Sequence, residues 1–231
     1  MENHSAAATR LHYELIRGLI DTGLCPTNAD LARRLNLPVQ AIEDQLRALA
    51  AIHGVVLHPH APAPWVIHPF SVTPTLNWIE GPTHSWWAPC IWCALGVAVL
   101  IGGDLRIHSR YGAEGESVTI PVTNGRPIGS KSLVVHFAIP PACAWDNVHQ
   151  HCAMVLPFHS ADEIPPWCDR HGLPQGQAVP LHQVAELATF WYGSHASPDW
   201  HKWTIPEAQA IFHRAGLTSA FWDLENKGGR F

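Results

Sequence analysis

Two cysteines are the residues of this sequence best suited to chemistry. Cys93 lies in a Trp-Cys-Ala-Leu-Gly run that begins at Trp92, and Cys152 lies further along the chain, just before an apolar segment. Two thiolates brought into one small pocket bind a soft metal far more tightly than oxygen or imidazole ligands do. The pair therefore predicts a soft-metal site built by two distant parts of the chain.

The surroundings of these cysteines resemble the organomercurial (alkylmercury) lyase family. The resemblance is carried by Trp-Cys-Ala-Leu around Cys93 and by the segment after Cys152, which ends in Phe158-His159-Ser160. It implies detoxification by cleavage of a carbon–mercury bond, with Cys93 and Cys152 as catalytic residues and mercury ligands. It also implies a small organometal substrate, an external dithiol or mercuric reductase as acceptor of the product, and no cofactor.

Gly96 departs from what the resemblance implies. Family members usually carry an aspartate at this position, where one helical turn places the carboxylate beside the first sulfur and lets it deliver a proton. Glycine can neither donate nor ligate, so another group has to do this. The candidates are Cys90, His149 or His151, and Asp146. Cys90 either shares a helix face with Cys93 as a third thiol or is merely a buried thiol that caps nothing.

Gly96 also motivates a second hypothesis. A diverged homologue without lyase activity would bind metal or organometal through its thiols, or would use Cys93 on another electrophile. A structural zinc site that combines Cys90-x-x-Cys93 with the His149-x-His151-Cys152 run is disfavoured. On a strand the two histidines would share a face and the cysteine after them would point away, and paired Cys-x-x-Cys knuckles are absent.

The overall composition limits the class of protein. The 231 residues are 47% hydrophobic and only 14% charged, with 17 histidines, 20 prolines and 11 tryptophans, which indicates a compact chain with many irregular connections. A net charge of −5 argues against a nucleic-acid partner. No apolar run approaches the length of a membrane span, and the first residues lack a signal-peptide pattern. We therefore expect a cytoplasmic protein with reduced thiols and no membrane partner.

Residues 1–68 are expected to form a degenerate winged helix-turn-helix domain. Apolar spacing predicts a helix that ends at Gly23, an N-cap at Thr27 begins a second, and Pro38 begins a third that ends near Gly54. Two short strands, 55–58 and 65–67, would form the wing. The third helix presents acidic residues where a DNA reader carries basic ones, so a structural role is favoured over a metal-responsive DNA-binding regulator.

Residues 69–231 are expected to form the alkylmercury-lyase-like catalytic domain, a mixed or antiparallel sheet with flanking helices, which makes the fold class α+β. Strand patterns follow one another without crossover helices. The strands are expected at 105–109, 117–122, 132–138 and 153–158, and the helices at 92–100, 161–170, 181–192 and 206–215. The stretch 69–86 has no strong periodicity.

Overall fold

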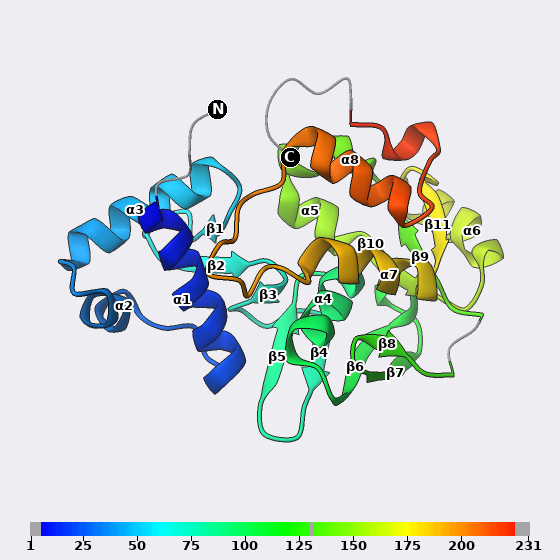
Figure 1. The fold of residues 1–231 in the computed structure, drawn as a ribbon. Helices are drawn as coiled ribbons and strands as arrows, with labels where there is room; N and C mark the ends of the chain where they lie inside the picture. Colours follow the sequence, from blue (N-terminus) through cyan, green and yellow to red (C-terminus); the bar gives the residue numbers. More distant parts are fainter. Residues whose placement is uncertain (1–5, 130–131, 225–231) are drawn as a thin grey trace.

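The protein is described from a computed structural model, which covers residues 6–129 and 132–224. The chain begins with α1 (Ala6–Thr22), α2 (Asn28–Leu35) and α3 (Val39–Ala51), which lie together at one end of the molecule (Figure 1). Their leucines and isoleucines, spaced three or four residues apart, are buried between them. Thr27 and Asp30 form a capping box at the start of α2, which fixes where this helix begins.

The main sheet contains eight strands within the described part of the chain, and all their pairings are antiparallel. The strand order is β1-β2-β3-β5-β4-β6-β7-β8. In β6 and β7, buried and exposed side chains alternate, so that one face packs on the core. The strands are β1 (Val56–Leu57), β2 (Pro64–Ile67), β3 (Phe70–Ser71), β4 (Asn77–Glu80), β5 (Ser85–Ala88), β6 (Asp104–Arg110), β7 (Ser117–Thr123) and β8 (Arg126–Pro127).

A second, three-stranded antiparallel sheet has the order β10-β9-β11. Its strands are β9 (Val134–Phe137), β10 (Val155–Phe158) and β11 (Gln177–Pro180). The remaining helices are α5 (Val148–Ala153), α6 (Ile164–His171), α7 (Leu181–Tyr192) and α8 (Ile205–Arg214), with short 3₁₀ turns at Tyr111–Ala113, Pro141–Asp146, Ala161–Glu163 and Ala220–Trp222.

The central helix α4 (Ile91–Ile101) is packed between elements of the larger part of the chain. Every residue from Ile91 to Ala98 is buried, as expected for a helix that is apolar all round. It packs against α7 on one side and against β4 and β5 on the other (Figure 1). A side chain at its N-terminus is therefore held in the middle of the molecule.

The structure confirms N-terminal helices followed by an antiparallel sheet with flanking helices. The stretch 69–86, for which no element was predicted, contains β3, β4 and part of β5, because short strands that are paired on both edges need no long alternating pattern. The predicted strand 153–158 begins later, at Val155, because Ala153 ends helix α5. Within the described ranges, no helix is long and apolar enough to cross a membrane.

Candidate active site

The first turn of α4 brings two cysteines together. Cys90 is the N-cap residue of this helix, and its sulfur accepts a hydrogen bond from the backbone N–H of Cys93 at 3.3 Å. Both thiols are buried. The reading of Cys90 as a thiol that caps nothing is therefore wrong, while the expectation that it shares a helical turn with Cys93 is met.

Two further ligand groups reach this turn from other elements. Cys152 comes from α5, and His68 comes from the turn between β2 and β3. One donor atom from each of His68, Cys93 and Cys152 lies within 4.8 Å of the other two. His68 Nδ1 is 3.5 Å from the sulfur of Cys93. We call these three residues together with Cys90 the thiol cluster.

Tyr192, the last residue of α7, closes the cluster from the opposite side. Its hydroxyl oxygen lies 3.3 Å from the sulfur of Cys93, and its side chain is buried. The ring packs directly against Gly96: a Cβ atom built there would overlap the ring and lie 2.7 Å from Cε2. The glycine one helical turn after Cys93 thus makes room for a phenol.

The cluster divides its thiols into unlike protonation states. Burial works to raise the pKa of the Cys93 thiol, but hydrogen bonds from Cys152, Cys90 and His68 outweigh it and bring this pKa well below its usual value. The pKa of Cys90 is raised by burial, and that of Cys152 by its hydrogen bonds to Cys90 and Cys93. The lowered pKa favours the thiolate form at Cys93, and the raised pKa values favour the protonated form of Cys90 and Cys152.

Behind the thiol cluster lies a small pocket of about 50 Å³ with aromatic walls. Trp92, Trp191 and Trp200 line it with Tyr192. Burial raises the pKa of the Tyr192 phenol well above its usual value, so the hydroxyl keeps its proton. The tryptophan side of this pocket suits an apolar organic group, while His53, His68, His151, His195 and Lys202 line the rest together with smaller residues.

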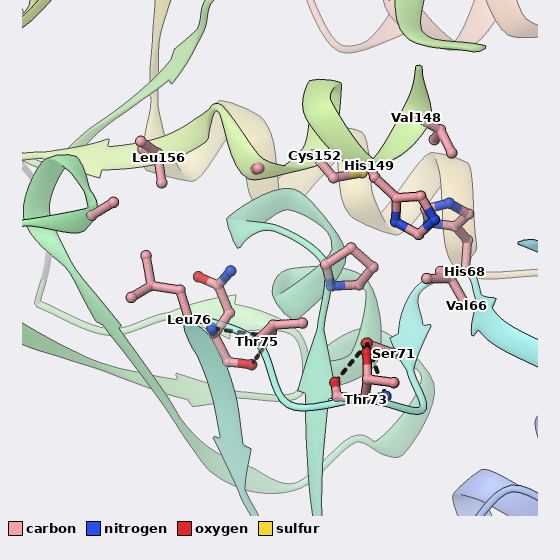
Figure 2. Close-up of a pocket in the computed structure, with 14 residues that line it drawn as sticks. Val66, His68, Ser71, Thr73, Thr75, Leu76, Val148, His149, Cys152 and Leu156 are labelled. Atoms are coloured by element: carbon pink, nitrogen blue, oxygen red, sulfur yellow. Dashed lines mark hydrogen bonds between the residues drawn. The ribbon is translucent and has the colours of Figure 1, made fainter. Parts of the chain in front are cut away.

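A second, larger cavity of about 400 Å³ lies on the other side of Cys152. Figure 2 shows His68 and His149 at one end of it and Leu76 and Leu156 at the other. Besides the two histidines and Cys152, its polar lining consists of the uncharged side chains Ser71, Thr73, Thr75 and Asn77. Among the described residues, no carboxylate lines either cavity.

The other predicted proton donors lie in different places. His149 is exposed and packs its ring near Trp65, with the centroids 5.5 Å apart. His151 is buried, and burial lowers its pKa to about 4, so it is neutral at ordinary pH. Asp146 is exposed and lines neither cavity. On helix α5 the strand argument against a zinc site does not apply, yet the ligand cluster that forms contains neither His149 nor His151.

Sequence reasoning missed His68 and Tyr192. The only local signal for His68 is a His-Pro step between two short apolar runs, and Tyr192 reads as one aromatic residue among many. Both reach the cluster through long-range packing, which a local pattern does not encode.

Comparison with known proteins places this geometry in a family. The family model for alkylmercury lyase, MerB, matches residues 70–193, more than half of the chain. The chain belongs to the alkylmercury lyase family. Its fold is similar to that in the crystal structure of the mercury-bound form of MerB2, with a TM-score of 0.58 and 19% identity over 82% of this chain and 97% of that one. No curated protein sequence matches the chain.

In this member of the alkylmercury lyase family, the matched residues contain every residue of the thiol cluster except His68, and they also contain Tyr192. Cys90, Cys93, Cys152 and Tyr192 fall inside the match, and His68 lies just before it. The site is thus assembled mainly by the part of the chain that defines the family.

Proposed function

We propose that this protein cleaves the carbon–mercury bond of a small organomercury cation by protonolysis. Cys93 attacks first because it is the thiolate of the cluster. Cys152 then joins the mercury, and the two sulfurs hold the divalent product until an external dithiol or mercuric reductase removes it. The observation that carries this proposal is the convergence of His68, Cys93 and Cys152 within 4.8 Å.

The cavities suit a substrate whose organic group is of modest size and carries no charge. The 400 Å³ cavity reaches Cys152 and is lined by apolar groups, hydroxyls and an amide, so it could admit a neutral alkyl or aryl group. The structurally similar MerB2 has a mercury-bound form, which supports mercury as the metal. His68 would hold the Cys93 thiolate in place through the contact between Nδ1 and the sulfur.

The test is anaerobic incubation with phenylmercury, followed by measurement of benzene. Cys143 is exposed and would capture the reagent without turnover, so all variants are made in a Cys143→Ser background. We expect benzene from this background and only the uncatalysed rate from Cys93→Ser and Cys152→Ser. Cys25→Ser is the matched control, since this thiol lines neither cavity. Absence of benzene above the uncatalysed rate in the background protein would reject the proposal.

A second candidate function is capture of soft metals or organometals without cleavage. The observation in its favour is that no described carboxylate lines either cavity, although three thiols meet there. In the same experiment this function gives one phenylmercury bound per chain, lost in Cys93→Ser, and no benzene.

We further propose that residues 1–68 form a degenerate winged helix with a structural role and that residues 69–231 form the catalytic domain. Three helices followed by the β1–β2 hairpin support the first assignment. On α3, Arg47 pairs with Asp44 at 2.9 Å and with Glu43 at 3.6 Å, so its charge is already compensated. Trp86 donates a hydrogen bond to the Leu19 carbonyl at 2.7 Å, which ties the two parts together.

A further inference from the structure

Cleavage of a carbon–mercury bond needs an acid that can deliver a proton to the carbon once the sulfurs have bound the metal. A thiolate bound to mercury has already lost its proton. The acid must lie beside Cys93, where the substrate is first held, and away from bulk water, which would compete for the site. Since no described carboxylate lines either cavity, the acid has to be of another kind.

Tyr192 meets these requirements by its position. Its hydroxyl lies 3.3 Å from the Cys93 sulfur, and it is the one hydroxyl among the described residues that line the aromatic pocket. The ring is held against Gly96, with Trp92 and His195 at centroid distances of 5.7 Å and 5.0 Å. A ring packed on these sides has little freedom to rotate, so its hydroxyl stays directed at the sulfur.

The nitrogen-bearing side chains of the pocket differ from Tyr192. His151 and His195 line it as buried rings whose pKa is lowered by burial, so they are neutral. His68 sits between the two cavities, with Nδ1 directed at the Cys93 sulfur itself. Lys202 donates to the His53 carbonyl oxygen at 3.3 Å and lies over the Trp145 ring. Neither shares the contact with α4 that Tyr192 makes at Gly96.

We propose that the Tyr192 hydroxyl protonates the departing carbon, in place of the carboxylate expected at Gly96. The inference rests on the proposed function and names the acid in its central step. Gly96 and Tyr192 then depend on each other, because the Tyr192 ring occupies the space that a side chain at position 96 would fill.

The step balances without an oxidant or a reductant. The electron pair of the carbon–mercury bond stays with carbon, which takes the Tyr192 proton and leaves as a neutral hydrocarbon. Mercury remains divalent and is held by the sulfurs of Cys93 and Cys152. The proton that Cys152 releases on binding mercury returns to the Tyr192 oxygen, so the phenol is restored.

The test is Tyr192→Phe, which removes one oxygen and keeps the ring against Gly96. Single-turnover benzene release and phenylmercury capture are measured separately on the full chain in the Cys143→Ser background. We expect capture at the level of the background protein and benzene release slower by about 10²- to 10⁴-fold, the range for loss of a general acid. Tyr111→Phe, which removes a phenol hydroxyl outside both cavities, is the matched control and should change neither quantity.

The outcomes separate this inference from the proposed function. No benzene from the background protein rejects both. Benzene release by Tyr192→Phe at the background rate rejects the role of Tyr192 alone. Equal losses of capture and release would show that the hydroxyl only positions the Cys93 thiolate, and would also overturn the inference.

A second pair of variants keeps the proposal testable if Tyr192→Phe is poorly folded. Tyr192→Ala vacates the space beside Gly96, and Tyr192→Ala combined with Gly96→Asp places a carboxyl group in it. We expect slow benzene release from the single variant and at least a tenfold recovery in the double variant. Equal rates from the two would contradict the assignment of this space to the proton donor.

Discussion

At the scale of single residues, the site depends on the fit between Gly96 and Tyr192. The close approach of the ring to α4 is open only to a residue without a Cβ atom. Sequence reasoning predicted that Gly96 departs from the family pattern and noted only that glycine can neither donate nor ligate. The structure shows that a side chain from another helix fills the space beside it.

Gly96→Ala should therefore destabilise the protein, although alanine is the better helix former. The added methyl overlaps the Tyr192 ring, and overpacking of this kind costs about 1–3 kcal/mol. In a Tyr192→Ala background the same substitution should instead stabilise by up to about 1 kcal/mol, because only helix propensity remains. Chemical denaturation of the four proteins gives the coupling energy. A destabilisation that persists without the ring would contradict the fit.

At the scale of elements, the first turn of α4 carries both the residue that caps the helix and a cysteine of the thiol cluster. Cys90 caps the helix through its sulfur, and Cys93 follows on the same turn. The cap satisfies one of the free N–H groups at the start of the helix. Because the N-cap residue precedes the helix, Cys90 also brings a third sulfur to the cluster without distorting the helical backbone.

Cys90→Ala should lower the free energy of unfolding by about 1 kcal/mol, since the N-cap acceptor is lost. Cys90→Ser should retain most of this stability because serine is a strong N-cap residue. Both variants should still capture phenylmercury through Cys93 and Cys152. Urea denaturation and mercury stoichiometry check the two statements independently. Loss of capture in the serine variant would show that Cys90 is a required ligand.

Element prediction succeeded where the pattern is local and long. Helix α7 has the bounds predicted from apolar spacing, and β6 and β7 follow from their alternation. It failed at β3–β5, where strands of two to four residues are defined by their partners. It also failed at α5, a six-residue helix whose Asn147 N-cap is its clearest local signal.

At the scale of the whole molecule, an unusual number of histidines lie in the interior. His12, His136, His151 and His195 are buried, and burial lowers the pKa of each. For His12 the pKa falls from 6.5 to about 3, and for His151 to about 4. These rings are neutral when folded and can charge when the chain unfolds.

Stability should therefore decrease as the pH falls below 6.5, the ordinary pKa of histidine. Between that pH and about 4, the unfolded chain binds protons at these histidines and the folded chain does not, which favours unfolding. Each such residue contributes about 1.4 kcal/mol per pH unit. His12→Phe keeps a ring stacked on Trp200 and should make the dependence shallower by that amount, while His182→Phe at an exposed site should not. Denaturation midpoints at pH 7.5 and 5 decide between these outcomes.

The sequence by itself indicated Cys93 and Cys152 as a soft-metal pair, the family, the α+β class and most of the long elements. These follow from residue type and local spacing, which are properties of contiguous segments. Only the tertiary structure decided that His68 joins the thiol cluster, that Tyr192 contacts it, that the pKa of Cys93 is lowered, and that no described carboxylate lines the cavities. Contacts and pKa values of this kind depend on burial and on partners far along the chain, and the packing of α4 against α7 and α5 supplies both.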